Sequence, residues 1–197
     1  KVLQEEIIQA YESYQFHHIY HRLHNFCSIE LGGFYLDIIK DRQYTTAGDS
    51  KARRSAQTAM YHIIQALSRW IAPILSHTAE EIWEYIPCEK LSSVFLSEWY
   101  TGFDTEDLDN IDFKMNSNFW QEIMEVRTAV YREIENQRNS GNIRSSLDAQ
   151  VILFASPRLQ SVLSELGDEL RFVLITSDVT ILPLSEVDEK AHKTELE

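Results

Sequence analysis

FYLDIIKDRQYT (Phe34–Thr45) and AGDSKARRSAQT (Ala47–Thr58) together contain the densest cluster of basic residues in this chain. Apolar residues recur at helical spacing along the first segment, and in the second Asp49 or Ser50 is suited to cap a new helix. The two segments therefore predict two helices joined by a short turn. Between Lys40 and Arg54 five basic side chains stand against two acidic ones, a local charge of +3, whereas the formal net charge of the chain is −13. This local reversal of sign is the first indication of function.

Helical periodicity extends on both sides of this turn. The 197 residues include only 6 glycines and 4 prolines, and most apolar residues recur at i, i+3, i+4 and i+7. We expect four helices, over residues 3–13, 16–45, 50–72 and 73–86, with a kink in the second where Gly32-Gly33 weakens helix formation. Helices joined by short turns in this way form an antiparallel bundle.

The second half of the sequence predicts a mixed architecture. A helix is expected over residues 116–139, and the apolar stretches AQVILFA (149–155) and VTIL (179–182) are typical of strands. Ser156-Pro157 begins another helix, and LRFVLIT (170–176) is ambiguous between helix and strand, with helix favoured. The predicted fold class is therefore mainly α, an antiparallel helix bundle followed by a small α/β appendage.

Three regions are expected along the chain. Residues 1–98 would form the helix bundle, residues 99–184 a long helix with a small α/β subdomain, and residues 185–197 a truncated acidic connector. The acidic run Asp104–Asp112 is expected to be solvated surface, because a dense charge run cannot be buried.

Composition argues against several classes of protein. No run of about 18 apolar residues occurs, so no membrane span is expected, and the first ten residues, KVLQEEIIQA, do not resemble a signal peptide. Cys27 and Cys88 are 61 positions apart without a CxxC partner, which indicates neither a disulfide framework nor a metal knuckle and fits a reducing cytoplasm. The acidic total argues against indiscriminate nucleic-acid binding, although a local basic face is compatible with it.

Side chains that could bind metal or catalyse a reaction have simpler explanations. His17, His21 and His24 fall at i, i+4 and i+7 and could ligate zinc, but no carboxylate or cysteine at ligand spacing accompanies them, so an ordinary polar face is favoured. Glu80 and Glu81 could act as acid and base, yet they follow a helix start, where acidic residues complement the helix dipole. The motifs GxxxxGK[ST], GxGxxG and GxSxG are absent. We therefore predict no catalytic and no metal-binding residues.

The basic residues are the remaining candidates. On a helical wheel Arg42 and Arg53 lie on the apolar faces of their helices, whereas Lys40, Lys51 and Arg54 point outward. The arginines could neutralise internal carboxylates or lie beyond the core at helix ends, or they could form a surface that contacts phosphates. Aromatic residues would then offer faces to unstacked RNA bases. The candidate RNA-binding residues are Lys40, Arg42, Tyr44, Lys51, Arg53, Arg54, Trp120, Arg127 and Arg132, and a family resemblance adds Arg144.

Several segments carry a resemblance to a known family: FYLDIIKDRQYT, ARRSAQTAMYHI, WIAPILSHTAEEIW and GDELRFVLITS. In this order and spacing they closely resemble the C-terminal part of bacterial isoleucyl-tRNA synthetases, and YQFHHIYHRLHNFC is similar to the family's entry to its anticodon-binding bundle. The resemblance implies a fragment of a class I synthetase that binds the anticodon arm of isoleucine tRNA. At residues 142–144 the chain reads Asn-Ile-Arg where the family tends to have Lys-x-Gly, which makes Arg144 a substitute candidate for a phosphate contact.

The resemblance also implies what the full-length enzyme does. It would join isoleucine to its tRNA through an ATP-dependent adenylate, with ATP and zinc as its cofactors. The family's HIGH and KMSKS signatures and its four-cysteine zinc ribbon are absent from this sequence, so the chain is expected to bind RNA without a cofactor and without catalysis. Its expected partners are isoleucine tRNA and its own catalytic domain, in a cytoplasmic monomer. Two alternatives remain open: the equivalent bundle of a valyl- or leucyl-tRNA synthetase, and a helical scaffold that docks only on the catalytic body.

Overall fold

The computed structural model describes residues 1–87, 89–103, 115–187 and 191–192. The chain divides into two compact units, Lys1–Glu106 and Asp107–Glu197. Both are built mainly from helices and the second contains a small parallel sheet, so the predicted fold class is confirmed.

Some sequence predictions concern residues that lie outside the described ranges. The acidic run at residues 104–112 and most of the predicted connector at 185–197 lie outside the described residues. The domain boundaries proposed at residues 98 and 184 stay predictions. Within the described ranges, no helix is both long and apolar enough to cross a membrane.

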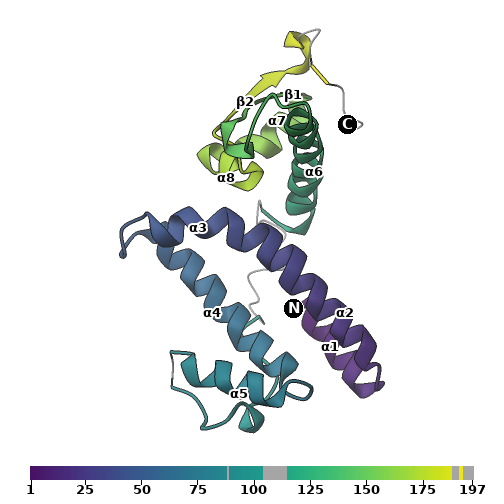
Figure 1. The fold of residues 1–197 in the computed structure, drawn as a ribbon, viewed down its shortest axis with the longest axis vertical. Helices are drawn as coiled ribbons and strands as arrows, with labels where there is room; N and C mark the ends of the chain where they lie inside the picture. Colours follow the sequence, from purple (N-terminus) through teal and green to yellow (C-terminus); the bar gives the residue numbers. More distant parts are fainter. Residues whose placement is uncertain (88, 104–114, 188–190, 193–197) are drawn as a thin grey trace. The chain divides into compact units, whose positions relative to one another are not determined.

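The first unit is a helix bundle in which the helices follow the predicted order (Figure 1). Its elements are α1 (Val2–Glu12), α2 (Phe16–Asn25), the π-helix η1 (Phe26–Leu36), α3 (Asp37–Tyr44), α4 (Lys51–Ile71), α5 (Ser76–Tyr85) and the short 3-10 helix η2 (Val94–Leu96). α2, η1 and α3 follow one another without a break and form one helical rod, and the chain returns along α4. Ser50 caps α4, as predicted, because its Oγ accepts a hydrogen bond of 3.2 Å from the backbone N–H of Arg53.

Two details of these helices differ from the prediction. Residues Phe26–Leu36 form a π-helix, whose hydrogen bonds run from i to i+5, where a kinked α-helix was expected. α5 begins at Ser76 and not at Pro73, because the chain first makes a turn in which the N–H of Leu75 donates to the carbonyl of Ile71 at 2.7 Å.

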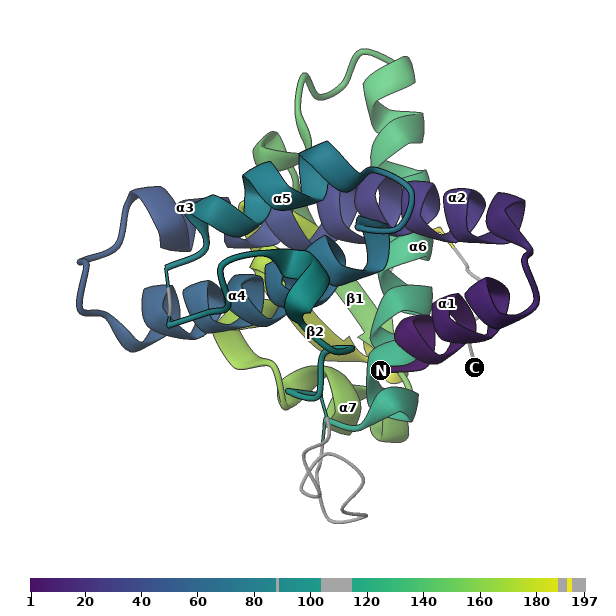
Figure 2. The same cartoon turned by 90° about the horizontal axis from the view of Figure 1, so that it is seen from below.

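The core of the first unit consists of two apolar clusters. The first joins α1, α2 and α4 through side chains that are at most 3% exposed, namely Ile7, Ile19, Ala66 and Trp70. The second surrounds Trp83 of α5 and the end of α4. A hydrogen bond of 2.7 Å from the Tyr11 hydroxyl to the Trp70 carbonyl also ties α1 to α4. In Figure 2 α1 lies beside α2, and α4 contacts the rod at α3.

The second unit packs helices against two strands, as predicted, and the strands are parallel. Its elements are α6 (Ser117–Asn139), η4 (Ser146–Asp148), β1 (Gln150–Ala155), α7 (Pro157–Ser164), η5 (Gly167–Glu169), α8 (Leu170–Leu174), β2 (Asp178–Pro183) and η6 (Leu184–Glu186). β1 and β2 pair in parallel, with Gln150 opposite Asp178 and Ala155 opposite Pro183. α7 and α8 contact the strands, and α6 lies against both helices. The ambiguous LRFVLIT segment forms the helix α8, as favoured from its sequence.

Candidate nucleic-acid interface

Side-chain hydroxyl groups hold the turn between α3 and α4. Thr45 Oγ1 and Thr46 Oγ1 each donate a hydrogen bond of 2.6 Å to a carbonyl four residues earlier. Ser50 Oγ donates to Thr46 Oγ1 at 3.1 Å while it caps α4. Such bonds satisfy backbone groups that lose their partners where a helix ends. We call this turn, together with the side chains of Lys40, Arg42, Lys51, Arg53 and Arg54, the basic corner.

Arg53 stabilises the turn from the side of α4. Its Nη1 donates a hydrogen bond of 3.3 Å to the carbonyl of Thr46, and its side chain is half-buried. Its buried Nε has no hydrogen-bond partner within the part of the chain that the structure describes. Because the guanidinium bridges the turn and the first turn of α4, Arg53 holds the corner in its conformation.

The two basic residues of α3 also have neighbours within the first unit. Lys40 Nζ lies 2.8 Å from Asp37 Oδ1, and this hydrogen bond raises the pKa of Lys40. Arg42 is half-buried near Tyr35, where its positive charge opposes the rise that burial causes in the pKa of the Tyr35 hydroxyl. Both cations therefore interact with the rod itself as well as contributing to the local positive charge.

Lys51 and Arg54 extend from the corner into solvent. Among the residues that the structure describes, no carboxylate oxygen lies within 4 Å of either cation. They stand in the first turn of α4, which has no acidic side chain, although the helix dipole disfavours cations there. A bound anion would relieve this repulsion. Tyr44, 87% exposed at the end of α3, offers a ring for stacking beside this anion-attracting surface.

The remaining candidates belong to the second unit. Arg127 is half-buried and serves a structural contact, since its Nε donates to the Val173 carbonyl at 3.1 Å. Arg132 and Arg144 are exposed. Trp120 is 37% exposed, with its ring edge-to-face against a neighbouring phenylalanine. Of these four, Arg132, Arg144 and Trp120 present surface to solvent.

The structure thus gathers six of the ten candidates and leaves the other four in a separate unit. The basic corner brings Lys40, Arg42, Lys51, Arg53 and Arg54 together beside Tyr44. Sequence reasoning missed the role of Thr46, which accepts one hydrogen bond from Ser50 and another, through its carbonyl, from Arg53. The signal that could have found it is TTAGDS, a cluster of turn-forming and hydroxyl residues between two helices.

The histidines of α2 form an exposed polar and aromatic face. His17, His21 and His24 are exposed, and the Tyr20 ring lies 5.3 Å from His21 and 5.8 Å from His24 between ring centroids. Within the described ranges, no group of three or more histidine, cysteine or acidic side chains is arranged to hold a metal ion. On this face His21 and His24 make ring contacts with Tyr20.

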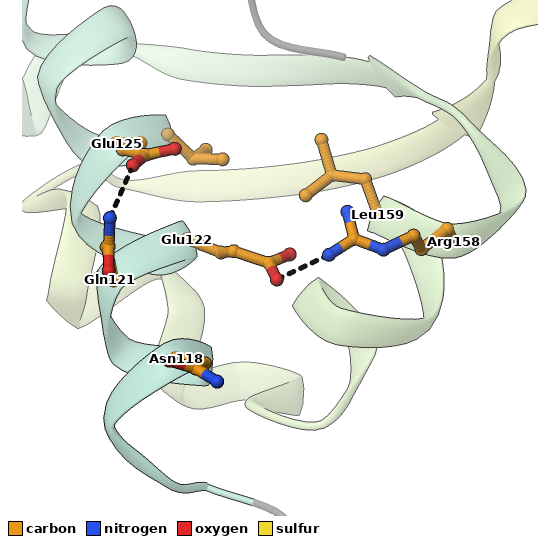
Figure 3. Close-up of a pocket in the computed structure, with 7 residues that line it drawn as sticks. Asn118, Gln121, Glu122, Glu125, Arg158 and Leu159 are labelled. Carbon is orange, nitrogen blue, oxygen red and sulfur yellow. Dashed lines mark hydrogen bonds and ion pairs between the residues drawn. The ribbon is translucent and has the colours of Figure 1, made fainter.

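A hollow of about 390 Å³ lies between α6 and α7 in the second unit (Figure 3). It is lined by Asn118, Gln121, Glu122, Glu125, Val126, Arg158 and Leu159. Arg158 Nη2 is 2.5 Å from Glu122 Oε1, and Gln121 Nε2 donates to Glu125 at 3.3 Å. Two carboxylates face a single guanidinium here, so the hollow repels phosphate, and the basic corner is the better candidate for contact with RNA.

Most of the chain, including the helix bundle, matches a known family of domains. The family model described as "Anticodon-binding domain of tRNA ligase" matches residues 1–153. The chain therefore belongs to this family of anticodon-binding domains, and the predicted resemblance is confirmed.

Curated proteins with high similarity to the chain include isoleucine–tRNA ligases from several bacteria. The chain is 53% identical to that of Marinomonas sp. over 100% of its length, 55% identical to that of Azotobacter vinelandii over 99%, and 54% identical to that of Stutzerimonas stutzeri over 99%. In each case it aligns with 20% of the relative, so the chain spans about a fifth of the length of the curated relatives it matches.

Proposed function

We propose that this chain binds the anticodon arm of isoleucine tRNA, as the anticodon-binding part of an isoleucine–tRNA ligase. The observation that carries the proposal is the match of residues 1–153 to the anticodon-binding family. The identity of 53–55% to isoleucine–tRNA ligases over nearly the whole chain supports isoleucine over the valine and leucine alternatives. The reversal of charge at the basic corner supplies the attraction to phosphate that an otherwise acidic chain lacks.

Within the basic corner we assign different roles to the individual side chains. Lys51 and Arg54 contact phosphates, because they are exposed and stand where the α4 dipole also favours an anion. Arg53 positions them through its bond to the turn. Tyr44 stacks on an unstacked loop base, since single-stranded RNA is recognised through its exposed base faces.

The other candidates have supporting roles in this proposal. Lys40 and Arg42 raise the local positive potential, while their contacts with Asp37 and Tyr35 keep them near the rod. In the second unit Arg132 and Arg144 are exposed enough to contact phosphates and Trp120 to stack on a base, and Arg127 supports α6 through its bond to α8.

For the whole protein we propose the activity in the names of its relatives, isoleucine–tRNA ligase, together with the cofactors and the monomeric state that the sequence resemblance implies. It joins isoleucine to tRNA with ATP, uses zinc, and works as a cytoplasmic monomer in which this chain adjoins the catalytic domain. The chain itself contributes tRNA selection and no catalytic group. Phosphate contacts would set the register of the RNA, and contacts to loop bases would distinguish isoleucine tRNA from others.

The proposal is tested by measuring the affinity of the 197-residue chain for isoleucine tRNA over a series of salt concentrations. Wild type should bind at low salt and lose affinity steeply as salt rises, because binding releases cations from the RNA. Arg54→Glu should weaken binding and lower the slope of log K against log salt by roughly 1. Arg171→Glu, an equal change of charge on the exposed face of α8, is the matched control and should bind like wild type.

The outcomes separate the rival roles of the corner. If wild type fails to bind isoleucine tRNA at low salt, the chain does not recognise tRNA by itself. If Arg54→Glu lowers the thermal stability but leaves tRNA affinity unchanged, Arg54 serves folding or docking on the catalytic domain. If both reversals weaken binding equally, attraction is diffuse and the basic corner is not the site.

A further inference from the structure

The helical rod of the first unit contains a long π-helix. π-helices occur mostly as single turns inserted in α-helices, whereas η1 spans eleven residues, Phe26–Leu36. α2 and α3, on either side of it, both lie against α4: Ile19 of α2 belongs to the cluster with Ala66 and Trp70, and α3 contacts α4 next to the basic corner. The rod must therefore turn the same face toward α4 on both sides of η1.

A regular α-helix of the same length could not do this. The buried residue of α2 is Ile19 and that of α3 is Ile39, twenty positions later. At about 100° per residue, twenty positions of an α-helix rotate by five whole turns plus about 200°. The two isoleucines would therefore point to nearly opposite sides of the helix. Asp37, eighteen positions after Ile19, would instead face α4, where burial of a carboxylate is unfavourable.

The π-helix corrects this mismatch. With i to i+5 hydrogen bonds it has about 4.4 residues per turn and rotates only about 82° per residue. Over its eleven residues η1 therefore rotates about 200° less than an α-helix of the same number of residues. This rotation brings Ile19 and Ile39 to the same side of the rod, and both side chains are buried, with exposures of 0% and 3%.

Glycine makes this geometry accessible. A Cβ on Gly32 would lie 2.9 Å from the carbonyl oxygen of Cys27, and one on Gly33 would lie 3.3 Å from that of Ser28. Each of these carbonyls is five residues earlier, at the spacing of a π-helical hydrogen bond. Gly32 therefore permits a close approach that any other residue would obstruct.

We infer that η1 carries two surplus residues, compared with an α-helix, which set the rotation of α3 and so aim the basic corner; Gly32 is needed only while the segment is π-helical, because its missing Cβ leaves room for the Cys27 carbonyl. This inference rests on the proposed function for its RNA-binding consequence. Removing two residues from η1 would leave eighteen positions between Ile19 and Ile39, which an α-helix crosses in about five whole turns. The rod can then become α-helical throughout without changing the direction of Arg42 or the turn that follows.

The test is a series of deletions within η1. Deleting Gly32-Gly33 should leave tRNA affinity within about threefold of wild type with the same salt slope, because the phosphate-contacting side chains keep their direction. Deleting Leu31 as well leaves seventeen positions between Ile19 and Ile39. An α-helix of that length rotates α3 about 100° short of five whole turns relative to α2. This three-residue deletion should weaken tRNA binding by more than about tenfold and flatten the salt slope. Deleting Thr58-Ala59 from the regular helix α4 is the matched two-residue control and should be as damaging as the three-residue deletion.

The results distinguish this inference from the proposed function. If the deletion of Gly32-Gly33 is as harmful as that of three residues, or if three residues can be removed without effect on binding and thermal stability, η1 does not set the rotation of α3. Thermal unfolding of the same series reports on the rotation of α3 even without RNA, since only the two-residue deletion should keep wild-type stability. Absence of tRNA binding by wild type would instead overturn the proposed function.

Discussion

Replacing Gly32 by alanine is predicted to destabilise the first unit, the opposite of what this change does in a regular α-helix. In an α-helix interior alanine is about 1 kcal/mol more favourable than glycine. In η1 the new Cβ would meet the Cys27 carbonyl oxygen at 2.9 Å, and crowding of this kind costs about 1–3 kcal/mol. After the intrinsic preference for alanine is subtracted, the free energy of unfolding should fall by up to about 2 kcal/mol. In a domain of this size each kcal/mol lowers Tm by about 4–8 °C.

Differential scanning calorimetry of wild type, Gly32→Ala and Gly48→Ala measures this effect. Gly48 is the matched control, because a Cβ there meets no atom within 4 Å and its backbone does not adopt a positive φ. We expect its Tm to stay within about 2 °C of wild type. A rise in Tm for Gly32→Ala would show that this segment behaves as an ordinary α-helix, and the account of η1 as a register-setting π-helix would have to be abandoned.

Three further predictions concern the packing of the two units. Lys90→Met should lower the free energy of unfolding by about 1 kcal/mol in urea titrations. Lys90 Nζ donates hydrogen bonds to carbonyl groups at the end of α5, including that of Ile86 at 2.6 Å. An unchanged free energy of unfolding would mean that these bonds do not stabilise the helix end. Ile123→Ala should destabilise the second unit by about 2–5 kcal/mol, since Ile123 is fully buried, and a smaller loss would indicate that the core of α6 collapses onto the vacated space. Burial raises the pKa of Tyr11 to about 12, so stability should be constant below the ordinary value of 10 and fall as the pH rises toward 12, because the unfolded state ionises first. Tyr11→Phe should reduce this alkaline decline in thermal unfolding experiments. Burial also raises the pKa of Tyr35 and Tyr100, so these residues should account for the remaining decline. A decline of unchanged size in Tyr11→Phe would assign it to those groups alone.

The starts of α4, α6 and α7 were predictable because short-range chemistry determines them, whereas the predicted start of α5 at Pro73 was wrong. Ser50 and Asn116 cap α4 and α6 through bonds to the backbone three residues later, a preference that is visible in the sequence. Ser156-Pro157 likewise begins α7, and β1 and β2 coincide with the two apolar stretches expected to be strands. Each of these features depends on a few neighbouring residues, so no knowledge of distant contacts was needed.

The candidate site was predictable in composition but only partly in arrangement. The charge reversal between Lys40 and Arg54 indicated the basic corner, and the structure shows that Arg53 bonds to the turn while Lys51 and Arg54 are exposed. The helical wheel had placed Arg53 on the apolar stripe, in keeping with this difference in exposure. It could not show the carbonyl of Thr46 as the partner of Arg53, because that bond depends on how the turn folds back.

The expectation of a kinked α-helix at Gly32-Gly33 was wrong, because Phe26–Leu36 form a π-helix. The sequence showed that these glycines weaken the helix, and a kink was the simplest expectation. We infer that a π-helix forms instead because α2, through the cluster around Ile19, and α3 both contact α4. That requirement comes from a third helix that is distant in sequence from Ile19, and local propensity carries no information about it.

The sequence by itself determined the family, the order of the helices and strands, and the presence of a basic turn in an acidic chain. These depend on periodicity, capping and charge, which act between residues close together in the chain. Only the tertiary structure decided the rotation of α3, the division of the basic residues into Arg53 within the turn and Lys51 and Arg54 outside it, and the direct contact of Arg127 with α8. Those outcomes follow from the packing of α3 on α4 and of α6 on α8, and packing is specified only once distant segments meet.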